Sequence, residues 1–308
     1  MGEEVDDTSG ISFVTAIHKR YVETCIIPEE VLHLPQPLGK DRTIELIGFE
    51  KSVKRVTEVI VSRMRISCCG DNCHQFQQVL SGAKTLVLSN NLLTEWSEVA
   101  KIVSHMESLT DLVLSYNKLK VPTNEELDKQ CLKSIKTLVI DNLEYDWNEI
   151  LWCAQMWPNI SQLEVWGNTI TELKTPHVLT QLNHLSLRNN NIEDWHRVCT
   201  LGTLPQLKYL DISDCNIKSI HFDDSNYDHK TTLFPQLESL LISSNKLKTW
   251  KDIAELNKLS KLEQLFCKNN PVFDCDKYDN NFNLILSRIE NHRSDAKRRR
   301  NRLFEENI

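Results

Sequence analysis

The fold of this chain is decided by the segment LNHLSLRNNNI at residues 182–192. It places leucine at its first, fourth and sixth positions, asparagine at its ninth and isoleucine at its eleventh. The same template, with conservative replacements, occurs nine times in the 308 residues, and successive copies begin 22 to 30 residues apart. The copies begin at Val56, Ala83, Leu109, Ile135, Ile160, Leu182, Leu207, Leu237 and Leu262.

A repeat of this length and leucine pattern is typical of the leucine-rich repeat. In each copy a short strand should turn its leucines inward, while the residue between them faces the solvent. The asparagine amide can bond backbone groups where the chain leaves the strand. Since one repeat cannot bury its own apolar row, stacked neighbours must complete the core. We therefore expect an α/β fold, a leucine-rich-repeat solenoid of about nine repeats with a concave parallel β-sheet and a helical or irregular convex side.

Three repeats lack asparagine at its usual position and carry Met64, Leu143 or Cys215 there. Cysteine is the usual substitute among these. Tryptophan recurs shortly after this position in every second repeat, at Trp96, Trp147, Trp195 and Trp250. Residues that favour a helix start precede three of these rings: Glu95, Asp194 and Thr249. We expect each ring to open a convex-side helix and pack it against the sheet, in preference to contacting a ligand.

The ends of the chain lack the repeat. Residues 1–55 are expected to form an N-terminal cap, with an amphipathic helix over residues 12–21. The repeat domain should span residues 56–275, and residues 276–308 should form a C-terminal cap helix and a basic tail. The segment Lys297–Arg302 holds five positive charges in six positions, which suits a nuclear-localisation signal, a contact with an acidic partner or a solvated helix end.

The composition bounds the function. With 43 acidic and 36 basic residues the net charge is −7, which disfavours general nucleic-acid binding. No run approaches the roughly 20 apolar residues that span a bilayer. The first ten residues carry no basic group, so no secretory signal is expected and the protein should be cytoplasmic. The ten cysteines should then be reduced thiols.

The cysteine-rich segment CCGDNCH at residues 68–74 resembles a metal site only superficially. It lacks a second ligand pair at zinc-finger spacing, and adjacent cysteines fit poorly on one tetrahedral ion. We predict a loop with no metal, and no cofactor elsewhere. The chain has no glycine-rich phosphate loop, no H-E-x-x-H and no G-x-S-x-G motif. We therefore predict that the protein is not an enzyme and has no catalytic residues.

A protein-binding site is expected on the concave face of repeats five to seven. The repeat register brings together six side chains there: Glu164, Trp166, His184, Arg188, Tyr209 and Asp211. Aromatic and arginine anchors of this kind are typical of binding hot spots. An ordinary hydrated surface is the alternative, but it does not readily explain an exposed tryptophan at a strand position.

Several segments resemble the tubulin-specific chaperone cofactor E family, most closely its cofactor E-like branch. They are Ser12–Tyr21, Ile66–Asp71, Leu88–Asn91 followed by Trp96–Val99, and Asn189–Trp195. Family members act on tubulin: cofactor E helps to assemble and dissociate the α/β heterodimer, and the E-like branch is linked to destabilising it. Residues 1–55 are too few and too poor in glycine to form the glycine-rich N-terminal domain of full cofactor E, which favours the E-like branch. Residues 1–308 contain no segment that resembles the ubiquitin-like domain with which both branches end.

The resemblance implies a non-catalytic tubulin-binding protein of the cytoskeleton, acting in tubulin folding, dissociation or microtubule organisation. Its partner would be α-tubulin or the α/β heterodimer, bound by a monomer through the concave face. The alternative is a nuclear or axonemal leucine-rich-repeat adaptor whose protein partner is not tubulin.

Overall fold

The structure is a computed structural model that describes residues 10–22 and 56–273, apart from residues 127, 130 and 225–228. The chain divides into two compact units. The first unit comprises residues 1–143 and 153–160, and the second comprises residues 144–152 and 161–308. The boundary passes through helix α5 (Trp147–Cys153).

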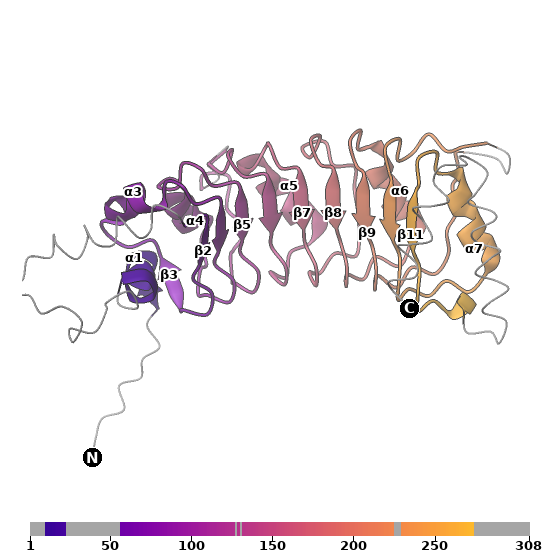
Figure 1. Ribbon diagram of the computed structural model, residues 1–308. Coiled ribbons are helices and arrows are strands. Elements are labelled where there is room, and N and C mark those ends of the chain that lie inside the picture. Colours follow the sequence, from indigo (N-terminus) through magenta and orange to yellow (C-terminus); the bar gives the residue numbers. More distant parts are fainter. Residues whose placement is uncertain (1–9, 23–55, 127, 130, 225–228, 274–308) are drawn as a thin grey trace, which may run out of the picture. The chain divides into compact units, whose positions relative to one another are not determined.

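The first unit contains four short strands that pair in parallel, each with the next along the chain (Figure 1). They are β2 (Glu58–Ile60), β4 (Thr85–Val87), β5 (Asp111–Val113) and β6 (Thr137–Val139). The second unit contains five more that pair in the same way. They are β7 (Gln162–Glu164), β8 (His184–Ser186), β9 (Tyr209–Asp211), β10 (Ser239–Leu241) and β11 (Gln264–Phe266).

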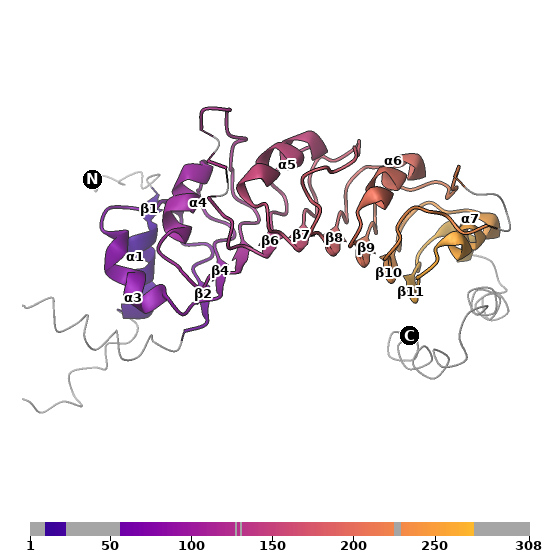
Figure 2. The same ribbon diagram turned by 90° about the horizontal axis from the view of Figure 1, so that it is seen from above.

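Each of these strands falls where the repeat pattern predicts it. The central residue is buried in all nine, from Val59 in β2 to Leu265 in β11, while its neighbours alternate toward the solvent in most strands. In each unit these strands lie at one side, whereas helices α4 (Trp96–Val103), α6 (Trp195–Cys199) and α7 (Trp250–Glu255) lie at the other (Figure 2). The predicted leucine-rich-repeat solenoid with a parallel sheet and partly helical opposite side is therefore confirmed. We call the solvent side of the strands the strand face.

Buried asparagines bond backbone groups where the chain leaves each strand, as predicted, and also join successive repeats. The Asn190 amide donates to the backbone oxygens of Leu187 and Val165 at 2.8 and 3.1 Å. Its oxygen accepts from the amide of Ile170 at 3.1 Å. Equivalent bonds come from Asn91, Asn117, Asn168, Asn245 and Asn270. Cys215 takes the same place in its repeat, where its thiol lies 3.2 Å from the Leu187 oxygen.

The residue before this position has a left-handed backbone in every repeat. Its φ ranges from 53° at Asn189 to 64° at Gly167. Asparagine adopts this region more easily than most residues, and glycine adopts it without steric cost. Tyr116 holds φ at 59° although a bulky side chain is uncommon there. The turn is therefore imposed by the stacking of repeats, even where the local residue disfavours it.

Four helices begin at the recurring tryptophans. They are α4 (Trp96–Val103), α5, α6 (Trp195–Cys199) and α7 (Trp250–Glu255). Short 3-10 helices follow three of them: Ala154–Met156, Thr200–Thr203 and Leu256–Lys258. The side chains of Asp194 and Thr249 cap their helices, whereas Glu95 makes no capping hydrogen bond. Asp146, which the sequence analysis did not count, accepts from the amide of Glu149 at 2.8 Å.

The packing role predicted for the tryptophans is confirmed for three of the four. Trp96, Trp147 and Trp195 are at most 4% exposed. Trp195 meets Phe222 edge to face, with ring centroids 5.5 Å apart. Trp250 is half-buried and meets Phe273 in the same manner at 5.4 Å. These rings fill the space between the helices and the sheet, so they are core residues of the repeats.

The N-terminal segment packs on the first repeat. Strand β1 (Ile11–Ser12) pairs in parallel with β3 (Ile66–Cys68) and leads into α1 (Phe13–Ile17). The chain then makes a π-helical turn, His18–Val22. The expected helix is thus present and ends in a wider turn. Ser12 begins it by accepting from the amide of Thr15 at 3.1 Å.

The segment after β3 forms a 3-10 helix, Cys73–Phe76, and α3 (Gln77–Leu80). Within it Cys69 and Cys73 form a disulfide, so the expectation that all ten cysteines are reduced is wrong for this pair. The tight turn between them brings their Cα atoms to 6.7 Å, within reach of one bridge. The other described cysteines, which are Cys68, Cys131, Cys153, Cys199, Cys215 and Cys267, form no disulfide.

The repeats end in a 3-10 helix, Pro271–Phe273. The predicted C-terminal cap helix and the basic segment Lys297–Arg302 lie outside the described residues, as does most of the predicted N-terminal cap. The domain limits at residues 55 and 275 therefore stay predictions. In the part of the chain that the structure describes, no helix is long and apolar enough to span a membrane.

Candidate protein-binding site

All six residues predicted for the binding site lie in the second unit, on three adjacent strands or just after them. Strands β7, β8 and β9 pair in register, so Gln162, His184 and Tyr209 form one cross-strand row. The next outward row on these strands contains Glu164 and Asp211, with Ser186 between them. Ser186 is outside the predicted set, although its place in the register makes it part of the same surface.

The centre of the site is a stacked pair of rings. The imidazole of His184 lies parallel to the phenol of Tyr209, with 3.9 Å between centroids and 5° between planes. Burial lowers the pKa of His184, against the opposing effect of Glu164 and Asp211. Burial also raises the pKa of Tyr209 to about 12, helped by Asp211 and Glu164. Both rings are therefore neutral at pH 7 and present a flat, partly buried platform.

The two acidic residues beside the rings differ in exposure. Glu164 is half-buried, whereas Asp211 is only 7% exposed. One oxygen of Asp211 accepts from the amide of Ser213 at 2.9 Å. The expectation that Asp211 is an exposed contact is therefore corrected: this carboxylate bends back to the chain that leaves its own strand. Its negative charge still acts on Tyr209 and His184.

Trp166 and Arg188 extend the surface beyond the strands. The amide of Gly167, next to Trp166, donates to the backbone oxygen of Arg188 at 3.1 Å, which sets the two residues side by side in successive repeats. Trp166 is half-buried and Arg188 is exposed. The positive charge of Arg188 lowers the pKa of Tyr209, against the larger effects that raise it, so the guanidinium acts on the ring platform.

The site thus combines neutral aromatic rings, two carboxylates and one exposed guanidinium on a rigid sheet. Such a surface can bury apolar contacts and pair charges with another protein, which is the usual composition of a binding hot spot. The structure brings together all six predicted residues. Five of them are at least partly exposed, and Asp211 contributes through its charge.

The strand face of the first unit has a different character. One of its two outward rows is aliphatic and contains Ile60, Val87, Val113 and Val139, whereas the other contains Glu58, Thr85, Asp111 and Thr137. Ile60 is 38% exposed, and the three valines are half-buried. The register identified this aliphatic row from the sequence, but the absence of charged or aromatic groups kept it out of the predicted site. It offers a narrow apolar strip on this face.

A separate group of three residues in the first unit has the chemistry of metal ligands. The ligand atoms of Cys69, Cys73 and His105 all lie within 4.8 Å of one another. His105 comes from the following repeat, 32 residues beyond Cys73, and for this reason the spacing of the cysteine-rich segment did not reveal it.

Comparisons with known proteins agree with this architecture. The family model described as Leucine Rich Repeat matches residues 206–226. A leucine-rich-repeat protein of Leptospira interrogans has a similar solved structure, with a TM-score of 0.51 and 23% identity, over 77% of this chain and 54% of that chain. This likeness concerns the fold alone.

Curated relatives extend the similarity over almost the whole chain. Tubulin-specific chaperone E of Xenopus laevis is 35% identical over 293 residues, which are 92% of this chain and 54% of that protein. Tubulin-specific chaperone E of Homo sapiens is 31% identical over 284 residues, 90% of this chain and 53% of that protein. The chain therefore spans about half the length of the curated relatives it matches.

Proposed function

The chain is homologous to tubulin-specific chaperone E over about half of that protein's length, and from this we propose that it is a tubulin cofactor. It binds tubulin without catalysing a reaction and acts in tubulin folding, dissociation or microtubule organisation. Tubulin is chosen as the partner because the relatives are tubulin-specific chaperones. The repeat fold, which offers a broad rigid surface, supports binding as the mode of action.

The partner is α-tubulin, alone or within the α/β heterodimer, and the protein binds it as a monomer. The site of action is the cytoplasm, in association with the cytoskeleton. Any change in the shape of tubulin follows from a difference in affinity for two tubulin states, because binding shifts a conformational equilibrium only by that difference.

We place the contact on the strand face of the second unit, at Glu164, Trp166, His184, Arg188, Tyr209 and Asp211. The observation that carries this choice is the parallel stack of His184 on Tyr209 at 3.9 Å. A rigid aromatic platform loses little side-chain entropy on binding, and Trp166 and Arg188 beside it belong to the residue types that dominate binding energies.

The basic segment Lys297–Arg302, which lies outside the described residues, adds attraction to acidic segments of tubulin. Such attraction between exposed charges is screened at physiological salt, so it matters most at low ionic strength. Replacing these basic residues by alanine should weaken tubulin binding at low salt. Unchanged affinity at low salt would reject a role for the basic segment in tubulin binding, without bearing on the strand-face contact.

Site-specific photo-crosslinking tests the proposed face and subunit together. A photo-reactive amino acid replaces Trp166 in one variant and Arg197 in another, and each is irradiated with purified tubulin heterodimer. Arg197 lies on α6, on the helix side of the same unit (Figure 2). We expect a crosslink from position 166 to α-tubulin and none from position 197.

The other outcomes are equally informative. A crosslink to β-tubulin from position 166 would show that the partner is β-tubulin and would still support contact through the strand face. A crosslink from position 197 alone would place the contact on the helix side. Absence of tubulin binding by the intact chain would reject the cofactor role in favour of an adaptor for a different protein.

A further inference from the structure

Cys69, Cys73 and His105 form a compact cluster inside the first unit. The two sulfur atoms and a ring nitrogen of His105 lie within 4.8 Å of one another. Cys69 and Cys73 are 4% and 7% exposed, and His105 is half-buried. The cysteines belong to the turn after β3, whereas His105 follows the end of α4, so the fold and not the local sequence brings the three groups together.

We propose that this cluster, with its cysteines reduced, binds one zinc ion through Cys69 Sγ, Cys73 Sγ and a ring nitrogen of His105. Zinc takes thiolate and imidazole ligands at about 2.3 and 2.0–2.1 Å in a tetrahedral arrangement. Its ligand atoms are then roughly 3.3–3.8 Å apart. The cluster holds its ligand atoms inside 4.8 Å, with the two sulfur atoms joined in a disulfide, so once that bond is reduced the sulfur atoms separate and small side-chain adjustments complete the site. Water fills the fourth position.

The backbone around the cysteines explains why these two, and not adjacent Cys68, face the histidine. Cys68 ends strand β3, where successive side chains point to opposite sides. Gly70 and Asn72 have positive φ values of 87° and 66°, which reverse the chain between the two ligand cysteines. The sequence argued against a metal because adjacent cysteines fit poorly on one tetrahedral ion and no second ligand pair follows at zinc-finger spacing. The cluster avoids the first objection by using Cys69 and Cys73.

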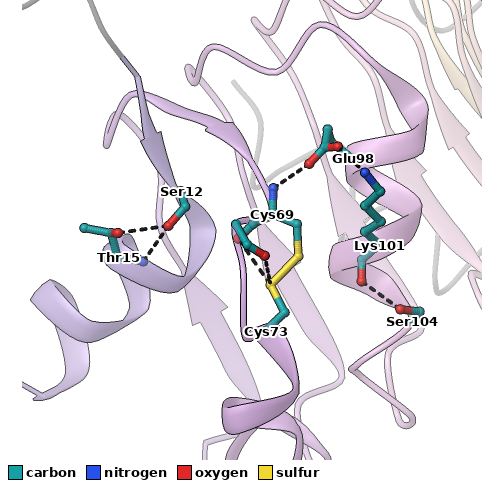
Figure 3. Close-up of a disulfide and its surroundings, with 8 residues drawn as sticks. Ser12, Thr15, Cys69, Cys73, Glu98, Lys101 and Ser104 are labelled. Atoms are coloured by element: carbon teal, nitrogen blue, oxygen red, sulfur yellow. Dashed lines mark hydrogen bonds and ion pairs between the residues drawn. A yellow bond between two sulfur atoms is a disulfide. The ribbon is translucent and has the colours of Figure 1, made fainter.

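A carboxylate ties the cysteine turn to the helix that precedes the histidine. Glu98 of α4 accepts from the amide of Cys69 at 2.7 Å and pairs with Lys101 at 2.6 Å (Figure 3). This contact holds the turn against α4, at whose end His105 lies. Groups outside the ligand set that fix ligand positions in this way strengthen metal binding. The site is therefore positioned before the metal arrives.

The disulfide and the zinc site are alternative states of the same two cysteines. A small-molecule thiol reductant converts one into the other: the Cys69–Cys73 bond accepts two electrons and two protons, and two reductant thiols become one disulfide. Zinc then binds as the two protein thiols release their protons. Zinc occupancy therefore requires reducing conditions.

Metal titration of the full chain tests the proposal. The chain is reduced with a phosphine, stripped of metal with a chelator and titrated with zinc against a competing indicator. Cobalt serves as a second probe, because its visible spectrum reports thiolate ligands and tetrahedral geometry. We expect one equivalent of zinc, with affinity at least about 100-fold lower in Cys73→Ser and in His105→Ala. The oxidised chain should bind none at this site.

Two substitutions of neighbouring residues provide matched controls. Cys68→Ser and His74→Ala remove a thiol and an exposed imidazole from the same segment but outside the cluster. Both should bind zinc as the unsubstituted chain does, and circular dichroism confirms that all variants are folded. No zinc binding by the folded, reduced chain would overturn the proposal. Unchanged affinity in His105→Ala, or loss of binding in Cys68→Ser, would overturn the assigned ligand set.

Discussion

The imidazole of His184 lies flat against the phenol ring of Tyr209, with 3.9 Å between their centroids and 5° between their planes. The two residues are cross-strand partners on β8 and β9, so the parallel register of successive repeats sets their rings against each other. This pair joins the fold to the proposed function, since the same register that builds the sheet also builds the platform for a partner.

The burial of His184 makes the stability of the protein depend on pH. Its folded pKa is lowered from 6.5, chiefly by burial, so the unfolded chain binds a proton at a higher pH than the folded chain. The contribution of neutral His184 to the free energy of unfolding is fully present above the unfolded pKa of 6.5. It is lost as the pH falls through 6.5 toward the lower pKa of the folded chain. We expect His184→Gln to reduce the loss of unfolding free energy between about pH 7.5 and pH 5.5, measured by urea denaturation. In His177→Gln, which alters an exposed histidine, the loss should stay as in the unsubstituted chain.

The buried asparagines should contribute strongly to stability. Asn190→Ala removes an amide that bonds four backbone groups in two repeats and leaves buried partners unsatisfied. We expect a loss of about 2–4 kcal/mol in the free energy of unfolding. Asn191→Ala, at the exposed neighbouring position, should change it by less than about 0.5 kcal/mol. Equal losses of unfolding free energy in the two variants would contradict the stabilising role of the buried asparagines.

The recurring tryptophans should differ in energetic weight. Trp195 is 3% exposed and packs edge to face on Phe222, so Trp195→Ala should cost about 3–5 kcal/mol. Trp250 is half-buried, and Trp250→Ala should cost less because part of its ring already meets water. Thermal and denaturant unfolding of the two variants would measure the difference. A larger loss for Trp250→Ala would contradict the packing described here.

The cysteine at the asparagine position should be chemically inert. Burial raises the pKa of Cys215 to about 12, so only about 10⁻⁴ of it is thiolate at pH 8. Cys199 and Cys267 have pKa values raised to about 12 for the same reason. We expect iodoacetamide to label these three much more slowly than half-buried Cys68, as measured by peptide mass spectrometry. Denaturation should remove the difference, and equal labelling rates in the folded chain would contradict it.

The fold could be predicted almost completely from the repeat template, because its leucines and asparagine each have one structural task in every copy. The strand positions follow from that template, and the four helix starts follow from the recurrence of tryptophan in every second repeat. The left-handed turn is different: it occurs at Asn189 and equally at Tyr116, where nothing in the local residue indicates it. Asparagine or glycine at this position favours the turn locally, but at Tyr116 the stacking between repeats has to decide the conformation.

The candidate site could be predicted as a set of columns but not as an arrangement of atoms. Register alone placed His184 beside Tyr209, yet the stacking of their rings depends on rotamers that sequence does not specify. The inward turn of Asp211 depends on a bond to the amide of Ser213, which is a local backbone contact. The cluster of Cys69, Cys73 and His105 escaped notice because its members come from different repeats.

The affinity of the chain for tubulin heterodimer tests the central claim most directly. The measurement compares the unsubstituted chain, the folded triple variant Trp166→Ala, Arg188→Ala, Tyr209→Ala and the control Arg197→Ala. We predict saturable binding that weakens at least about 100-fold in the triple variant, since each anchor contributes about 1–2 kcal/mol or more. The control should bind as the unsubstituted chain does. Equal affinity of the triple variant and the unsubstituted chain would contradict the strand-face site, and absence of binding by all three would contradict the tubulin role itself.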